Sequence, residues 1–124
     1  LRVKIFLSSG NIKRAKFIYQ EWFKRKLKIQ PQTNCAGSIF KNFSLKVAKK
    51  NNILTPSAGW LIDQCGLKGM KIGKAIVSKK HANFIVNTGQ AKANDVIILI
   101  SLIKQKVRNK FNIQLQEEIQ YIGF

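Results

Sequence analysis

The sequence has few of the residues on which metal sites and disulfide frameworks depend. It contains two cysteines, Cys35 and Cys65, no CxxC pair and a single histidine, His81. These are too few to complete a zinc site, so no metal site is predicted. A disulfide between the two cysteines is one alternative. Two small free thiols in a reducing cytoplasm are the alternative that we favour.

Long apolar runs are also missing. The longest mostly apolar stretch is "VIILISLI", residues 96–103, which is far short of the about 20 residues that span a bilayer. The opening "LRVKIFLSSG" lacks the apolar core of a secretory signal. We therefore expect no membrane partner and a cytoplasmic location. With 124 residues, 45% of them hydrophobic, the chain is long enough for one domain with a core.

Acidic residues are scarce, at 5 Asp+Glu against 23 Lys+Arg, which gives a net charge of +18. Such a charge favours a nucleic acid or another anionic ligand. However, most of the basic residues are Lys, and Asn and Ile are plentiful, as in proteins of AT-rich genomes. Nucleic-acid contacts favour Arg and exposed aromatic residues, and neither is clustered here. We expect no nucleic-acid partner, and we keep a basic binding module as the alternative function.

The first ten residues differ in pattern from the rest. "LRVKIFL", residues 1–7, alternates apolar and basic residues, which predicts a half-buried strand. The chain opens on Leu1 rather than Met, so we interpret it as a piece of a longer protein. Residues 1–10 are expected to be the end strand of a preceding domain or a linker, and residues 11–124 the domain itself.

Periodicity and capping signals predict three helices, over residues 11–28, 55–66 and 93–110. Asn11 is expected to cap the first helix, Thr55 to cap the second with Pro56 at its first position, and Asp95 to lie in the first turn of the third. Residues 44–54 are either a poor helix or an inserted loop. Short strands are predicted at residues 38–40, 75–77, 83–87 and 119–123. The predicted fold class is α+β, a short-stranded sheet packed against about three helices.

The stretch "CAGSIFKNF", residues 35–43, leaves two alternatives open. Gly37 sets Ser38 at the start of a short strand, so Ser38 is either a turn residue or a proton donor. Lys41 and Asn42 follow, and they alternate sides if the run stays extended.

Five blocks of the sequence together resemble one known family. They are "RKLKIQP", "AGSIFKNF", "SAGWLIDQCGLKGMKIG", "VSKKHANFIVN" and "KQKVRNKFNIQLQEEIQYIG". In order and spacing the chain is similar, from about residue 1 to residue 123, to the C-terminal domain of the UDP-N-acetylenolpyruvylglucosamine reductase (MurB) family. The resemblance implies an FAD- and NADPH-dependent oxidoreductase of peptidoglycan synthesis that converts UDP-N-acetylenolpyruvylglucosamine to UDP-N-acetylmuramate.

The same resemblance implies that FAD and NADPH are bound mainly by an N-terminal flavin domain. That domain would be the partner of this chain, and residues 1–10 would be its end strand. The chain alone is therefore not expected to turn over. A decayed, non-catalytic reductase fragment and a fragment that works in trans with a separate flavin domain remain as alternatives.

The resemblance also assigns site residues. Ser38 matches the serine that protonates C2 of the substrate, and Gly37 lets the backbone approach the substrate closely. Glu118 matches the glutamate near the substrate carboxylate, where a second carboxylate favours its protonated, hydrogen-bond-donating form. A strand would point Glu117 and Glu118 to opposite faces, and the match of "EEIQYIG" to the family selects Glu118.

Three further residues are candidates for substrate binding. Asn42 matches a substrate-contacting asparagine of the family. Lys41 either steadies charge at the site or binds a structural carbonyl. His81 lies near the sugar or diphosphate, or else is a surface histidine at a strand entry. The glycines in "GLKGMKIG" are interpreted as a structural turn rather than a phosphate loop, because the Walker pattern is missing. Phe43 and Glu117 stand where the family has prolines, and Gln120 where it has an arginine.

Overall fold

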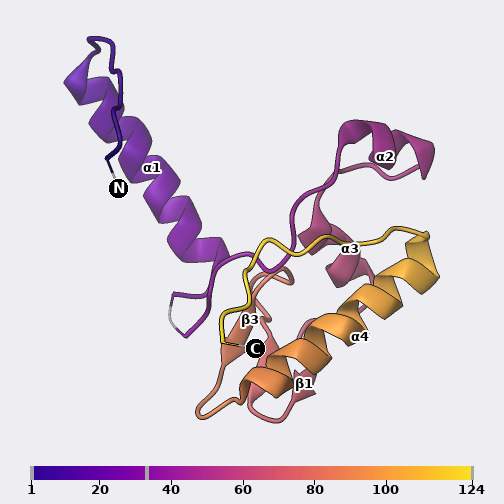
Figure 1. Cartoon of the computed structure of the whole chain (residues 1–124). Helices are drawn as coiled ribbons and strands as arrows, with labels where there is room; N and C mark the ends of the chain where they lie inside the picture. The colour runs from indigo at the N-terminus through magenta and orange to yellow at the C-terminus, as the bar shows by residue number, and fades with distance from the viewer. Residues whose placement is uncertain (1, 33, 124) are drawn as a thin grey trace.

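The computed structural model describes residues 2–32 and 34–123. Within them lie four helices, α1 (Ile12–Ile29), α2 (Leu45–Lys50), α3 (Ala58–Gln64) and α4 (Ala93–Phe111), and three strands, β1 (Lys71–Ile72), β2 (Ala75–Val77) and β3 (Ile85–Asn87). Figure 1 shows α4 lying across the small sheet, while α1 projects away from it. The α+β class is confirmed. The fourth helix is α2, which forms in the segment that the sequence left open between a helix and a loop.

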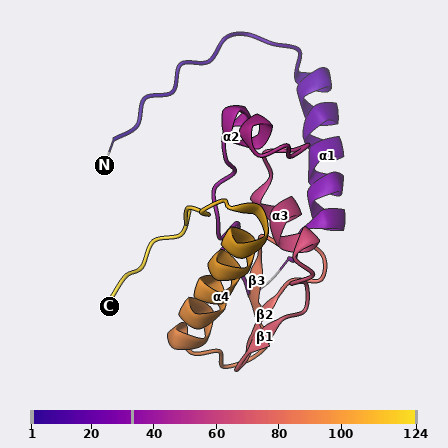
Figure 2. The same ribbon diagram turned by 90° about the vertical axis from the view of Figure 1, so that its right-hand side faces the viewer.

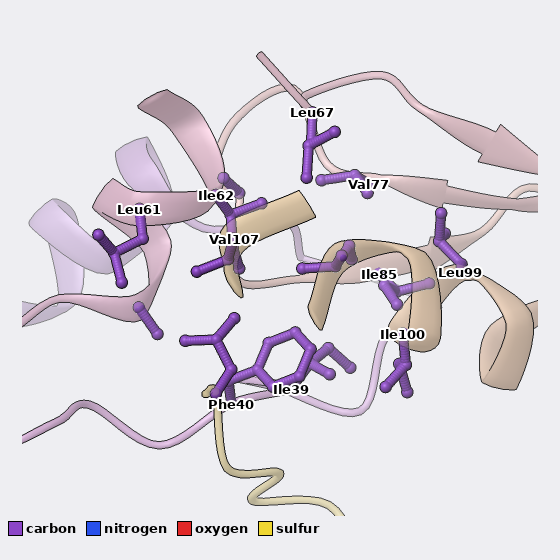
Figure 3. Packing of buried hydrophobic residues seen from close by; sticks show 14 of the residues in the cluster. Ile39, Phe40, Leu61, Ile62, Leu67, Val77, Ile85, Leu99, Ile100 and Val107 are labelled. Atoms are coloured by element: carbon purple, nitrogen blue, oxygen red, sulfur yellow. The ribbon is translucent and has the colours of Figure 1, made fainter. Parts of the chain in front are cut away.

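The sheet is antiparallel in the order β1-β2-β3. Its central strand is short and apolar, and Ala75 and Val77 are fully buried. The helix α4 covers this sheet with the face that periodicity predicts, and Leu99, Ile100 and Ile103 are buried along it. Each such side chain stabilises the fold by about 1.5–3 kcal/mol through burial. Figure 3 shows Val77, Leu99 and Ile100 in one cluster with Leu61 and Ile62 of α3 and with Phe40 from the segment after α1.

The start of α3 differs from the sequence prediction. Ser57, not Thr55, is the N-cap, and its hydroxyl accepts a hydrogen bond from the Trp60 N–H at 3.2 Å. Pro56 lies before the cap, and its carbonyl accepts the Phe43 N–H at 3.1 Å. The helix therefore starts later than predicted because Pro56 is used in a tertiary contact. It ends before Gly66, as expected, with Gly66 in the left-handed region at φ +69°.

The glycine-rich connection contains the unpredicted strand β1 and a tight turn at Gly73, which has φ +53°. A Cβ at Gly73 would collide with the carboxylate of Asp95. That carboxylate accepts the Lys92 N–H at 3.0 Å and the Lys74 N–H at 3.5 Å, so it joins the start of α4 to the β1–β2 turn. The interpretation of these glycines as structural agrees with this geometry.

Residues 2–29, which we call the arm, differ from residues 34–123, which we call the body. Asn11 caps α1 as predicted and accepts the Arg14 N–H at 3.0 Å. No residue of α1 is buried, and residues 2–10 form no helix or strand and are exposed. Figure 2 shows this stretch running away from the body. The strand predicted over residues 1–7 is wrong for residues 2–7, because the described residues include no partner strand for them, and Leu1 lies outside the described residues.

The strands predicted at residues 38–40 and 119–123 are also wrong as regular strands. Residue Phe40 forms one isolated antiparallel bridge with Glu117, and no strand follows that bridge within the described chain. Both segments are extended, but they pair with each other only at this bridge. The helices of the described chain include none long and apolar enough to cross a membrane.

Candidate functional site

Two distant segments of the chain lie side by side and carry the predicted site. The Glu118 N–H donates to the carbonyl of Ile39 at 2.8 Å, and the Lys41 N–H donates to the carbonyl of Gln116 at 2.8 Å. In Figure 1 the C-terminal segment (yellow) passes beside the segment that follows α1 (purple). Ser38 and Glu118 are thereby placed on neighbouring stretches of backbone.

Ser38 is half-buried and follows a glycine in the left-handed region. Gly37 has φ +89°, and a Cβ there would meet nothing within 4 Å, so backbone strain rather than space requires glycine at this position. Within the described chain the Ser38 hydroxyl makes no hydrogen bond. The hydroxyl is therefore available to a ligand.

The adjacent acids Glu117 and Glu118 have different surroundings. The Glu117 carboxylate accepts a hydrogen bond from Lys104 of α4 at 2.7 Å. This bond lowers the pKa of Glu117, against the effect of burial, and a hydrogen bond with Tyr121 lowers it further. Burial, together with the Glu117 contact, raises the pKa of Tyr121 to about 12. Glu118 is exposed and forms no ion pair in the described part of the chain. Only Glu118 is thus unengaged.

Lys41 and Asn42 continue the Ser38 segment along one side of a cavity of about 420 Å³. The Asn42 Oδ1 accepts the N–H of Ala58, the first residue of α3, at 3.1 Å. Its amide nitrogen makes no hydrogen bond within the described residues. The cavity is rich in amides and lacks carboxylates; its polar lining includes Lys41, Asn42, Asn51, Asn112, Gln114 and Gln116.

His81 lies elsewhere in the body. Its Nδ1 accepts the Asn83 N–H at 3.2 Å, and a Cβ on Gly59 would come within 3.0 Å of its ring. Burial lowers the pKa of His81, and the charge of Lys68 lowers it further. The ring is therefore neutral at pH 7, with its proton on Nε2. It lines a separate cavity of about 140 Å³ together with Lys68 and Lys80.

The structure thus brings Ser38, Lys41, Asn42 and Glu118 onto two paired segments and places His81 at a different cavity. Between them lies Asn83, a buried residue that the sequence analysis treated only as part of a strand. Its side chain bonds the backbone of Phe40, as described below. The only sequence feature that points to Asn83 is its place directly before an apolar run. That feature does not reveal that its partner is Phe40, more than forty positions away.

The body provides no obvious site for a metal or for the diphosphate of a flavin. No group of three or more His, Cys, Asp or Glu in the described residues could hold a metal ion, and both cysteines are free thiols. The space beside Gly73 is filled by the carboxylate of Asp95, and that beside Gly69 by the side chain of Lys79. An acidic side chain in the turn disfavours a phosphate, so this turn does not fit the diphosphate of FAD.

These features define a small α+β domain whose two paired segments present a serine hydroxyl and a glutamate carboxylate. The family profile described as "UDP-N-acetylenolpyruvoylglucosamine reductase, C-terminal domain" (MurB_C) matches residues 30–122. The chain belongs to this family.

Relatives and a solved structure agree. The chain is 53% identical over 88 residues to "UDP-N-acetylenolpyruvoylglucosamine reductase" of Chloroherpeton thalassium, which covers 71% of this chain and 27% of that protein. It is 38% identical over 123 residues to the protein of the same name from Prochlorococcus marinus, covering 98% and 38%. The crystal structure of UDP-N-acetylenolpyruvylglucosamine reductase (MurB) from Thermus caldophilus matches with a TM-score of 0.65 and 35% identity, over 90% of this chain and 36% of that one. The chain spans well under half the length of these relatives.

Proposed function

We propose that this chain is the substrate-binding, proton-donating domain of an FAD- and NADPH-dependent reductase in the cytoplasm. The reductase converts UDP-N-acetylenolpyruvoylglucosamine to UDP-N-acetylmuramate for peptidoglycan synthesis. The observation that carries the proposal is the pairing of the Ser38 and Glu118 segments, each with its functional side chain unengaged. Family membership supports the choice of substrate.

The chemistry requires two groups from this chain. A reduced flavin held by another domain would supply the hydride that reaches C3 of the enolpyruvyl group. Negative charge then builds on the neighbouring carboxylate, and C2 must be protonated. Ser38 is the proton donor, and Glu118 is the group that steadies the growing charge. The separate environments of Glu117 and Glu118 support this assignment, because Lys104 already neutralises Glu117.

The remaining candidates place the substrate. Asn42 and Lys41 line the larger cavity beside the Ser38 segment, where a free amide and an ammonium group suit a sugar or a diphosphate. His81 and Lys80 line the smaller cavity and bind the sugar or diphosphate from there. Gly37 keeps the backbone next to Ser38 free of a side chain.

A flavin-binding domain is the proposed partner, joined to this chain or supplied separately. The family profile starts at residue 30, while the longer match to the Prochlorococcus protein includes the arm. The exposed apolar side chains of α1 then face that domain; they include Ile12, Phe17, Tyr19, Trp22 and Phe23. Residues 1–10 would pair with its sheet, which this chain by itself cannot provide.

The proposal is tested with Ser38→Ala in the assembled reductase. NADPH should still reduce the flavin at the normal rate, while turnover of the enolpyruvyl substrate falls by about 10²–10⁴-fold. Ser101→Ala, which removes an exposed hydroxyl on α4, should leave both steps unchanged. Normal turnover by Ser38→Ala would remove Ser38 from the mechanism.

The second candidate function is that of a basic binding module without catalytic activity. The composition of α1 favours it, because this helix is rich in Lys and Arg and has Glu21 as its only acidic residue. It predicts tight binding to a polyanion, with an affinity that falls steeply with salt, and no affinity for the UDP-sugar. Titration of the chain with each ligand separates the two functions.

A further inference from the structure

Asn83 is one of only two polar side chains buried within the described residues, with 4% of its surface exposed. Its amide makes two hydrogen bonds to a single residue. The Phe40 N–H donates to Oδ1 at 3.0 Å, and Nδ2 donates to the Phe40 carbonyl at 2.8 Å. The backbone carbonyl of Asn83 also accepts the Ile39 N–H at 2.9 Å. One residue therefore holds the backbone directly after Ser38 at three points.

This clamp completes a three-part arrangement around the Ser38 segment. The segment is held to the C-terminal segment by the Glu118–Ile39 and Gln116–Lys41 hydrogen bonds. It is held to the β2–β3 loop by Asn83, whose side chain forms the backbone hydrogen bonds that a neighbouring strand would form in a sheet. The side chain of Phe40 is itself 1% exposed and packs in the core. The offset between Ser38 and Glu118 therefore depends on the position of Asn83.

Hydrogen bonds within residues 78–83 fix the position of Asn83. Its N–H donates to His81 Nδ1, and the Ser78 hydroxyl accepts the N–H groups of Lys80 and His81 at 3.1 and 3.3 Å. Ser78 is the other buried polar side chain. No polar atom of this buried set lacks a partner among the described residues. The hydrogen bonds of this loop thus fix the position of Asn83.

We propose that Asn83 is a positioning residue for proton transfer: it sets the location of the Ser38 hydroxyl relative to Glu118 without contacting the substrate. The proposal rests on the proposed function, in which Ser38 is the proton donor. Proton transfer requires donor and acceptor within hydrogen-bond reach, and a displacement of about 1 Å can lower a rate by about 10²-fold. A purely structural asparagine would instead change stability alone.

The test uses Asn83→Asp in the assembled reductase. The aspartate keeps an acceptor for the Phe40 N–H but loses the donor to the Phe40 carbonyl and sets two acceptors against each other. Turnover should fall by about 10–100-fold, while flavin reduction by NADPH and the KM for the UDP-sugar stay within about threefold of wild type. The solvent deuterium isotope effect on turnover should rise, because protonation becomes the slow step. Asn83→Ser, which is smaller and cannot bridge both Phe40 groups, gives the same readout if the aspartate does not fold.

Asn87→Asp is the matched control. Asn87 lies in the same hairpin, and its Oδ1 accepts the Gly89 and Ala91 N–H groups at 2.8 and 3.0 Å, so the aspartate preserves these bonds with the same change in charge. It should leave turnover and the isotope effect unchanged. A double variant, Ser38→Ala with Asn83→Asp, should be no slower than Ser38→Ala alone, because Asn83 acts only through Ser38.

The outcomes separate the two proposals. If Ser38→Ala is slow but Asn83→Asp turns over normally, or lowers turnover with no change in isotope effect, the positioning role is wrong and the proposed function stands. The positioning role is also wrong if Asn83→Asp lowers turnover by the same factor in the Ser38→Ala variant as in the wild type. If Ser38→Ala turns over normally, the proposed function fails, and the positioning role fails with it.

Discussion

The arm and the body contain similar fractions of apolar residues, but the body buries them and the arm exposes them. In the body, Leu61, Ile62 and Leu99 are fully buried, and α3, α4 and the sheet share one core. In the arm, Phe17 and Trp22 are 63% and 58% exposed. The difference teaches that the body can fold around its own core, whereas the arm has an apolar surface that this chain does not cover.

The arm is instead supported by local contacts. Tyr19 stacks on Phe23 at 5.8 Å between ring centroids, Arg25 lies 5.5 Å from the ring of Trp22, and Lys24 pairs with Glu21 on the surface. Contacts of this kind contribute about 0.2–0.5 kcal/mol each. Most helix stability in proteins comes from packing of an apolar face, and no residue of α1 is buried, so we expect α1 to be less stable than α4 in this chain.

The largest difference between the regions is expected from a pair of phenylalanine truncations. Phe40→Ala in the body should lower the free energy of unfolding by about 3–5 kcal/mol, because it leaves a cavity in the core. Phe17→Ala in the arm should change it by less than about 0.5 kcal/mol. Chemical unfolding of the chain, followed by circular dichroism, measures both. An equal loss for the two variants would mean that the arm packs on the body.

The same contrast explains what the sequence could predict. Helix signals are local, so Asn11 and Asp95 located the starts of α1 and α4 correctly. Strand pairing is not local: the extended segments at residues 2–7 and 119–123 have a strand-like pattern but no partner strand among the described residues. β1 was missed because two residues between glycines carry no period.

The candidate site shows the same division. Ser38 and Glu118 were proposed from the resemblance of whole blocks, since spacing alone could not bring residues so far apart together. Asn83 was not proposed at all, because a side chain that bonds backbone groups leaves no pattern in the sequence. Its partner Phe40 is recognisable only in the folded chain.

A pair of glycine substitutions should give an intermediate effect. Gly73→Ala combines a positive φ with a collision against the Asp95 carboxylate, and we expect a loss of about 1–3 kcal/mol in the free energy of unfolding. Gly10→Ala in the arm meets nothing within 4 Å and should be neutral. Thermal unfolding of the two variants measures the difference. A neutral Gly73→Ala would show that the turn does not hold α4 through Asp95.

The smallest expected effect is a pH dependence that belongs to the body alone, because the single histidine lies there. Burial lowers the pKa of His81 below its ordinary value of 6.5 in the folded state. Well above pH 6.5 the ring is neutral in both the folded and the unfolded state, so the His81 pKa shift takes nothing from the free energy of unfolding. Below that value the unfolded chain binds a proton that the folded chain resists, and stability falls until the pH passes the folded pKa. The change is modest because the ring is only half-buried.

Two variants sharpen this last comparison. His81→Gln should flatten the stability profile between about pH 6.5 and the folded pKa. Lys68→Met removes a charge that lowers the His81 pKa. It also frees Asp63, whose charge raises the His81 pKa, so the loss of stability at low pH should become smaller. An NMR titration of the single imidazole gives the folded pKa directly, and denaturation at several pH values gives the stability. A folded pKa at or above that of the unfolded chain would reverse the sign and show that the Asn83–His81 loop accepts a charged ring.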